Sequence, residues 1–340
     1  MKHEESGLRA GLPCACRIRA SGKAHLPGPV RQYIYLSLAL LLDEMPASTL
    51  EESVPQLSSD IERSLDRAVL VMKSLGKEDF INGELAGPAS HLLGHPGKLL
   101  RPALVFIGAE AIGERPSEFI DLAVASELMH TSSLIHDDII DGDLMRRGMP
   151  TVHKEYGSAA AILAGDALIA KAIEMAAPYG SRVLRHITRA AMMMCAGEAL
   201  DYRCQVEGVT PTLVQYMEIA RLKSAALIGA SCSIAPVYKG SGIADRIYGL
   251  GEGIGIAFQI RDDMEDFVEN MDMGDGTTGE RMRPNIVTTL MEERSIGDGD
   301  ALEEAARINN RCIDDACEGI EKEGFAAKFI EYSKSIRVRT

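Results

Sequence analysis

The feature that most constrains the fold is an almost unbroken helical periodicity from about residue 48 onward. Apolar residues recur every three or four positions, and Ser58-Ser59-Asp60 is a typical helix start ahead of one such stretch. The same spacing continues through 98–112, 117–140, 158–177, 182–206, 211–231, 243–270 and 300–323. The breaks are short and rich in turn residues, and neither hairpin signals nor alternating strands are found. The sequence therefore predicts a single all-α domain of about ten helices.

Composition supports this fold class and excludes several kinds of partner. The chain of 340 residues has 16 Met, nine Tyr, seven Phe and no Trp, which favours packed helices over sheets. Its formal charge of −14 argues against the basic field that a nucleic-acid binder needs. No apolar run approaches the roughly 18 residues of a membrane-spanning helix. The seven scattered Cys indicate reduced thiols and a cytoplasmic protein, not a disulfide framework.

The first 44 residues differ from the rest. They carry six bases against four acids and contain the apolar run 33–42, but Asp43-Glu44-Met45-Pro46 follows where a signal peptide would need small residues. We therefore expect Met45 to be the physiological start. On this hypothesis residues 1–44 are an extension outside the fold, and residues 45–340 form the domain.

Two acidic clusters carry the chemistry. Each has aspartates at positions i, i+1 and i+4 after an apolar helical stretch: Asp137, Asp138 and Asp141 in the first, Asp262, Asp263 and Asp266 in the second. On a helix, i and i+4 point the same way, so two like charges repel unless a cation such as Mg²⁺ offsets them. A single cluster is more often a solvated helix face. Because the same spacing occurs in both clusters, we favour an arrangement in which two helices face one metal–diphosphate centre.

Basic residues near the clusters are consistent with a phosphate ligand. Lys98 and Arg101 lie one turn apart at an expected helix start, where backbone amides also favour anions. Arg146-Arg147 follows the first cluster, and Lys223 lies on a mostly apolar helix. Each alone is better explained as a solvated surface group. Together with six aspartates they indicate a cleft that holds diphosphates through metal bridges.

Three stretches carry a resemblance to a known family. Residues 127–153, residues 164–168 and Phe258-Gln259-Ile260-Arg261-Asp262-Asp263-x-x-Asp266 resemble the aspartate-rich and flanking motifs of the trans-polyprenyl diphosphate synthases. The similarity in order and spacing covers roughly residues 55–335. It implies the isoprenoid synthase helical bundle with a central elongation cavity, and usually a homodimer.

The resemblance also implies a reaction and roles for individual residues. Isopentenyl diphosphate would attack the cation formed when an allylic diphosphate, held by several Mg²⁺ ions, loses its diphosphate. The six aspartates would be catalytic, with Asp137, Asp141 and Asp262 as metal ligands and Asp138, Asp263 and Asp266 supporting them. Residues matching the family's allylic diphosphate site are Arg146, Lys223 and Gln259. Those matching its isopentenyl diphosphate site are Lys98, Arg101, His130 and Arg147.

Product length follows from the residues one turn before the first aspartate. Short-product members of the family have bulky aromatics there, where this chain has Ser132 and Ser133. Small residues leave the floor of the cavity open, and Met129 would form a deeper floor. We therefore expect a product of twenty carbons or more.

The sequence also departs from the family pattern. Glu280 occupies the position of a lysine that reaches the allylic diphosphate, and Arg281 or Arg283 would have to replace its charge. His95-Pro96-Gly97 lacks the first glycine of the usual pair. Two alternatives to the synthase stay open: a non-catalytic or regulatory subunit of a heteromeric prenyl synthase, favoured by Glu280 alone, and a terpene cyclase of the same fold. Retention of Lys98, Arg101 and His130 argues against the cyclase.

Overall fold

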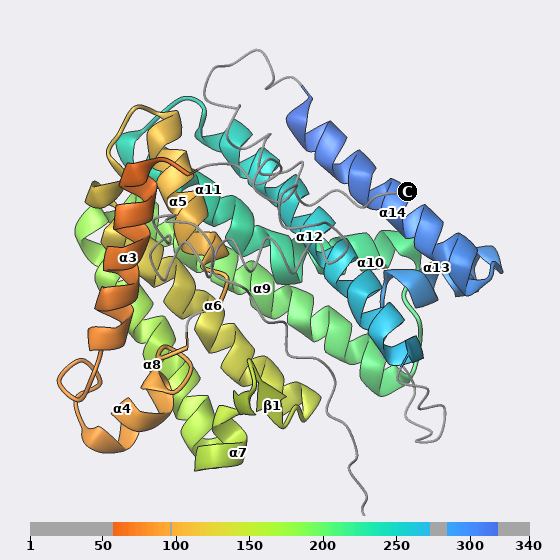
Figure 1. The fold of residues 1–340 in the computed structure, drawn as a ribbon, viewed down its shortest axis with the longest axis horizontal. Coiled ribbons are helices and arrows are strands. Elements are labelled where there is room, and N and C mark those ends of the chain that lie inside the picture. Colours follow the sequence, from red (N-terminus) through yellow and green to blue (C-terminus); the bar gives the residue numbers. More distant parts are fainter. Residues whose placement is uncertain (1–56, 96, 273–283, 319–340) are drawn as a thin grey trace, which may run out of the picture.

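The protein is a bundle of α-helices in the residues that the computed structural model describes, which are 57–95, 97–272 and 284–318 (Figure 1). The all-α prediction is therefore confirmed. Its elements are α3 (Ser59–Ser74), α4 (Gly83–Ser90), α5 (Leu100–Ala111), the 3₁₀ turn η1 (Pro116–Glu118), α6 (Ile120–Asp141), β1 (Met145–Arg146), β2 (Met149–Pro150), α7 (Val152–Tyr156), α8 (Ser158–Ala176), the 3₁₀ turn η2 (Ala177–Tyr179), α9 (Ser181–Glu207), α10 (Leu213–Ala220), the π-helical turn η3 (Arg221–Ala225), α11 (Ala226–Lys239), α12 (Ala244–Asp272), α13 (Ile286–Arg294) and α14 (Asp298–Cys317).

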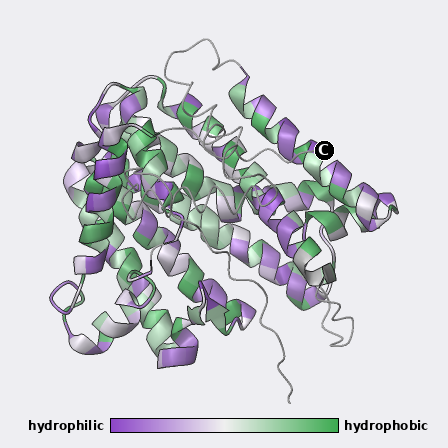
Figure 2. Ribbon diagram, in the orientation of Figure 1, coloured by the Kyte–Doolittle hydropathy of each residue, from purple (hydrophilic) through white to green (hydrophobic). Residues whose placement is uncertain are grey.

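The centre of the bundle consists of helices that are apolar on almost every side. In α11 every residue from Ala226 to Pro236 is buried, and α6 is buried continuously from Leu122 to Met129. Helices of this kind are stable only inside a larger core. By contrast, α3 and α14 alternate hydrophobic and hydrophilic residues and cover the bundle from outside (Figure 2). The polar C-terminal half of α6 therefore emerges from a rigid apolar base.

A short hairpin corrects the prediction that the chain has no strands. Strands β1 and β2 pair antiparallel through the two-residue turn Arg147-Gly148. Both turn residues have positive φ, 53° at Arg147 and 75° at Gly148, which is typical of the type I′ turns that match strand twist. Strands of two residues are too short to produce an alternating pattern of apolar and polar residues, so this hairpin could not be predicted from periodicity. The hairpin presents Arg146 and Arg147 beside the end of α6.

The predicted helix over 211–231 is interrupted. Its first part, α10, starts two residues later than expected, because Thr212 forms a capping box with Gln215. The backbone then forms the π-helical turn η3 before continuing as α11. Such turns occur frequently at functional sites. Here the turn carries Lys223.

Some predictions fall on residues outside the described ranges. They concern the extension 1–44, Glu280, and the two arginines Arg281 and Arg283. In the described residues no helix is both long enough and apolar enough to cross a membrane.

Candidate functional site

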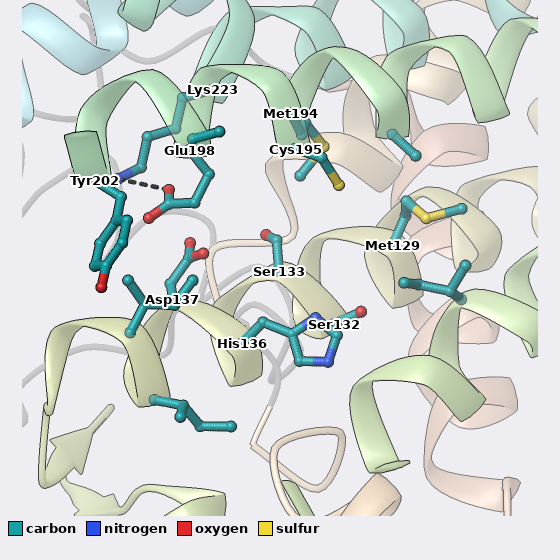
Figure 3. Close-up of a pocket in the computed structure, with 15 residues that line it drawn as sticks. Met129, Ser132, Ser133, His136, Asp137, Met194, Cys195, Glu198, Tyr202 and Lys223 are labelled. Atoms are coloured by element: carbon teal, nitrogen blue, oxygen red, sulfur yellow. Dashed lines mark ion pairs between the residues drawn. The ribbon is translucent and has the colours of Figure 1, made fainter. Parts of the chain in front are cut away.

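A cavity of about 550 Å³ lies between α6 and α9. Met129, Ser132, Ser133 and Asp137 line one wall from α6, as the helical spacing predicts, and Glu198 and Lys223 close the polar end (Figure 3). The apolar part of the opposite wall comes from α8 and α9: Ile169, Ala191, Met194, Cys195, Ala199 and Tyr202. The cavity is therefore apolar along its length and charged at one end, which suits a hydrocarbon chain with an anionic head.

Asp137 projects into the charged end of this cavity. Burial, together with the neighbouring carboxylates of Glu198 and Asp141, raises the pKa of Asp137 to about 7, while Lys223 and Arg146 act in the opposite direction. Figure 3 shows Asp137 and Glu198 pointing toward each other from α6 and α9. Two facing carboxylates of this kind favour a cation between or beside them.

Lys223 joins this cavity to the second aspartate cluster. Its ammonium lies 2.6 Å from Asp201 Oδ2 and 2.8 Å from Glu198 Oε2, and Gly197 allows α9 to come this close to η3. A Cβ at Gly197 would meet the backbone nitrogen of Lys223 at 2.3 Å. Lys223 also lines a smaller hollow that includes Gln259 and Asp263 of α12.

Asp263 is fixed within a hydrogen-bond network. Its Oδ2 accepts hydrogen bonds from Tyr216 Oη at 2.7 Å and from the Ile286 amide at 3.2 Å, and its Oδ1 accepts one from Gln259 Nε2 at 2.7 Å. The Ser224 hydroxyl in turn donates to the side-chain oxygen Oε1 of Gln259. Burial raises the pKa of Asp263 to about 6 although these donors oppose the shift. Asp263 therefore supports the site from behind, and Gln259 is oriented by it.

Asp262 lies within electrostatic reach of Lys98, one of the bases predicted to bind isopentenyl diphosphate. Burial raises the pKa of Asp262 to about 7, and the positive charge of Lys98 acts against that shift. The Lys98 ammonium lies 5.8 Å from the ring centroid of Phe258, one turn before Asp262 on α12. Asp266, a turn further along, is exposed, and Asp141 is half-buried at the end of α6.

Asp138 is buried beneath the first cluster and pairs with the hairpin. Its side chain is 0% exposed, and Arg146 Nε donates to its Oδ1 at 2.8 Å. Arg146 also donates to Asp143 Oδ2 at 2.9 Å. Asp138 thus holds Arg146 at the rim of the site and does not itself line the cavity.

The remaining predicted bases gather around a buried acid. Arg101 and Arg147 act electrostatically on both Glu127 and His130, which lie one turn apart on α6. Burial, followed by Arg101, Arg147 and Arg146, lowers the pKa of His130 well below its usual value. Arg147 is fixed by a 2.9 Å hydrogen bond to the His95 carbonyl. The structure therefore brings together three of the four predicted isopentenyl diphosphate residues, Arg101, His130 and Arg147, whereas Lys98 has Phe258 and Asp262 of α12 as its neighbours.

The donor set fits a hard divalent cation shared with phosphate. In the described part of the chain no group of three metal-ligating side chains converges, so neither cluster is a closed cage. Mg²⁺ does not need one, because it binds through one or two carboxylates plus phosphate oxygens. The raised pKa values of Asp137 and Asp262 indicate carboxylates that a cation would stabilise in their charged form.

Sequence reasoning missed Glu198, Asp201, Tyr216 and Ser224. Glu198 and Asp201 are three residues apart on one face of α9, directly after Gly197 in an apolar segment. That spacing could have identified them as a pair, since an acidic pair on an apolar helix requires a partner. Tyr216 and Ser224 act through Asp263 and Gln259, and no local pattern predicts such long-range contacts.

A helical bundle with paired aspartates and a ring of bases above an apolar cavity defines a class of proteins that bind diphosphates of hydrocarbon chains. Comparison with known proteins identifies the family within this class: the family model for polyprenyl synthetase matches residues 82–308. The chain belongs to the polyprenyl synthetase family, as its motifs predict.

Individual relatives agree with this assignment. The chain is 40% identical over 190 residues to a short chain isoprenyl diphosphate synthase of Methanothermobacter thermautotrophicus, covering 54% of this chain and 58% of that protein. It is 33% identical over 283 residues to a geranylgeranyl pyrophosphate synthase of Geoglobus acetivorans, covering 79% and 86% respectively. The solved structure of a geranylgeranyl pyrophosphate synthetase from Geoglobus acetivorans superposes with a TM-score of 0.71 at 28% identity, covering 81% of this chain and 99% of that one. The first of these matches spans less than two thirds of its relative's length.

Proposed function

We propose that the protein is a Mg²⁺-dependent prenyltransferase that condenses isopentenyl diphosphate with an allylic diphosphate to give a trans-polyprenyl diphosphate of twenty carbons or more. The observation that carries this proposal is the polar end of the cavity. There Asp137, Glu198 and Lys223 meet above an apolar chamber of about 550 Å³, and Lys223 connects it to the α12 cluster. The named activities of relatives in the same family support it.

Each group of residues has a distinct task in this reaction. Asp137, Asp141 and Asp262 would hold Mg²⁺, which stabilises the negative charge of the departing diphosphate. Arg146, Lys223 and Gln259 would bind the allylic diphosphate. Lys98, Arg101, His130 and Arg147 would hold isopentenyl diphosphate so that its double bond faces the allylic carbon. The apolar walls exclude water, which would otherwise capture the allylic cation.

Product length would be set by the cavity wall on α6. Ser132 and Ser133 are small and line the chamber, and Met129 lies one turn deeper. The chamber continues past both serines to Ile169 of α8 and Met194 of α9. A growing chain therefore has room beyond the first turn, which supports a long product.

Assembly and location complete the proposal. The protein would act in the cytoplasm as a homodimer, and exposed apolar side chains on neighbouring helices α8 and α9, including Leu163 at 59% and Met192 at 69% exposure, support the dimer. We also propose that residues 45–340 form the synthase domain, and the family match to 82–308 lies inside that range.

One assay tests the proposal against its alternatives. Purified protein is incubated with Mg²⁺, labelled isopentenyl diphosphate and allylic primers of five, ten, fifteen and twenty carbons, and the products are sized. A linear diphosphate of twenty carbons or more is expected. Absence of condensation with every primer would indicate a non-catalytic subunit of a heteromeric synthase. A cyclic hydrocarbon formed without isopentenyl diphosphate would indicate a terpene cyclase.

A further inference from the structure

Glu198 is the charged residue of the cavity to which the proposed reaction has so far given no task. It lines the chamber with Asp137, Ser133 and Lys223, and its side chain is 14% exposed. Its Oε2 is ion-paired with the Lys223 ammonium at 2.8 Å, and within the described part of the chain no further hydrogen-bond partner of its two oxygens is found. A largely buried carboxylate whose single partner is a lysine shared with another carboxylate is costly and needs a reason.

Neutralising Lys223 does not supply that reason. Asp201 Oδ2 accepts a hydrogen bond from the Lys223 ammonium at 2.6 Å and is one unit of negative charge, so it balances the lysine alone. Glu198 therefore adds a surplus negative charge, and it adds it opposite Asp137, whose pKa it helps to raise. An enclosed surplus of this kind is favourable only when positive charge arrives between the two walls.

The place of Glu198 along the cavity indicates which positive charge this is. Asp137 and Lys223 mark the end that holds the diphosphate, whereas Met194, one turn before Glu198 on α9, already belongs to the apolar wall. The carbon bonded to the diphosphate oxygen must lie at this border between polar and apolar lining. Figure 3 shows the carboxylate of Glu198 reaching from α9 toward Lys223 and Asp137, while Met194 and Cys195 lie on its other side.

We propose that Glu198 is a catalytic residue whose carboxylate stabilises the positive charge that develops on the allylic carbons of the substrate. This rests on the proposed prenyltransferase function and adds a residue to it. The carbon–oxygen bond breaks heterolytically and both electrons leave with the diphosphate oxygen, so the three allylic carbons share one positive charge. The isopentenyl double bond then supplies two electrons for the new carbon–carbon bond, and the proton lost afterwards passes to the diphosphate. Glu198 forms no bond and takes no proton.

Preorganised charges of this kind act mainly on the transition state. The ground-state substrate is neutral at its allylic carbons, so Glu198 gains interaction energy only as charge develops. Its negative charge lies close to the diphosphate site and therefore weakens ground-state binding. Glu198 should consequently raise kcat without lowering KM, which separates it from a residue that only orients Lys223.

The test compares Glu198→Gln, which keeps the shape and removes the charge, with Asp201→Asn, which also contacts Lys223 but does not line the larger cavity. For Glu198→Gln we expect kcat to fall about 100-fold with the KM for allylic diphosphate unchanged or lower. For Asp201→Asn we expect mainly a higher KM. If Glu198 only held the lysine, both variants would raise KM alike and kcat would stay within twofold of wild type.

A second measurement reports on the cation itself. Fluorine at C2 of the allylic diphosphate withdraws electrons and slows ionisation, and this penalty should be larger in Glu198→Gln than in wild type. Glu198→Asp, which retains the charge, should keep more kcat than Glu198→Gln; equal values for the two variants would overturn the inference. Near-wild-type thermal unfolding of each variant excludes misfolding. Failure of the wild-type enzyme to condense any primer would instead refute the proposed function.

Discussion

At the scale of single residues, the two adjacent aspartates of each cluster have different surroundings. Consecutive residues on a helix point about 100° apart, so the side chains of Asp137 and Asp138 leave α6 in different directions. Asp137 projects into the cavity, whereas Asp138 is fully buried against Arg146. On α12, Asp262 acts electrostatically with Lys98 while Asp263 accepts three hydrogen bonds from the scaffold. In each pair, therefore, one aspartate is held by contacts with the scaffold, and the other is the one to which the proposed function assigns Mg²⁺.

The buried member of the first pair can be tested through stability. Asp138→Asn removes the charge that holds Arg146, and we expect the free energy of unfolding to fall by about 2 kcal/mol. The matched control is Asp143→Asn, which breaks the second contact of the same arginine at a position 36% exposed and should cost under about 1 kcal/mol. Urea unfolding of both variants gives the comparison. Equal losses of unfolding free energy in the two variants would show that the burial of Asp138 does not strengthen its contact with Arg146.

His130 provides a pH dependence at the same scale. Its pKa in the folded protein is well below its usual value, so the unfolded chain takes up a proton first as the pH falls. Stability from this group is therefore present above about pH 6.5, the usual pKa of an unfolded histidine, and is lost as the pH falls below it. His130→Gln removes the effect, and urea unfolding at pH 7 and pH 5 should show a smaller loss than in wild type. An equal loss of unfolding free energy in wild type and His130→Gln between pH 7 and pH 5 would contradict this prediction.

The residue roles show what a sequence can and cannot provide. Asp137 and Asp262 were predictable because aspartates spaced by four on a helix share a face. The division of labour within each cluster was not, because it depends on Arg146 arriving through a hairpin and on Tyr216 donating from a helix 47 residues earlier. Glu198 was not identified from the sequence either, because its proposed role depends on its contact with Lys223, which lies on another helix.

At the scale of elements, the close approach of α9 to η3 brings the lysine into the site. Gly197→Ala would place a Cβ 2.3 Å from the Lys223 backbone nitrogen, which cannot move as a side chain can. We expect a loss of about 2 kcal/mol in stability and a higher KM for allylic diphosphate as Lys223 is displaced. Gly249→Ala in α12, where a Cβ would meet nothing within 4 Å, should instead stabilise by about 0.5–1 kcal/mol. Thermal unfolding and steady-state kinetics distinguish the two; equal behaviour would remove the packing argument.

The face of α6 that lines the cavity gives a second prediction for an element. Ser133→Phe places an aromatic ring in the chamber one turn before Asp137, so elongation should stop earlier and the mean product should shorten by at least one five-carbon unit. Ser74→Phe, at an exposed position of α3 far from the chamber, is the control and should leave product length unchanged. Sizing of labelled products decides. An unchanged distribution in Ser133→Phe would show that the floor lies elsewhere.

Long elements were predicted better than short ones. The ranges of α6, α8, α9 and α12 were predicted to within a few residues because each shows several turns of periodic apolar residues. The π-helical turn η3 was missed because 3.6-residue periodicity continues on both sides of it. The hairpin around Arg147-Gly148 was missed because its pairing involves two residues per strand.

At the scale of the whole molecule, α8 and α9 leave an apolar surface uncovered. Exposed large hydrophobic residues on these two helices are Ile162, Leu163, Ile173, Met192, Tyr202 and Val206. Tyr202, together with the exposed Cys195 and Ala199, also lines the cavity. A partner on this face would therefore shield both the apolar patch and one wall of the chamber, which links assembly to the proposed activity.

The decisive variant places a charge at Met192, the most exposed of these apolar residues. In a two-fold dimer Met192→Glu buries two unpaired carboxylates, one from each copy, so we expect the dimer dissociation constant to rise at least about 100-fold, which corresponds to about 2.7 kcal/mol. Leu70→Glu on α3 is a matched control, because Leu70 is 66% exposed and Met192 is 69% exposed. Sedimentation velocity should then show a dimer for wild type and Leu70→Glu and a monomer for Met192→Glu. A wild-type monomer at micromolar concentration, or a Met192→Glu dimer of unchanged affinity, would place the interface elsewhere. Because the face also borders the cavity, the monomeric variant should lose condensation activity while retaining its helical content by circular dichroism.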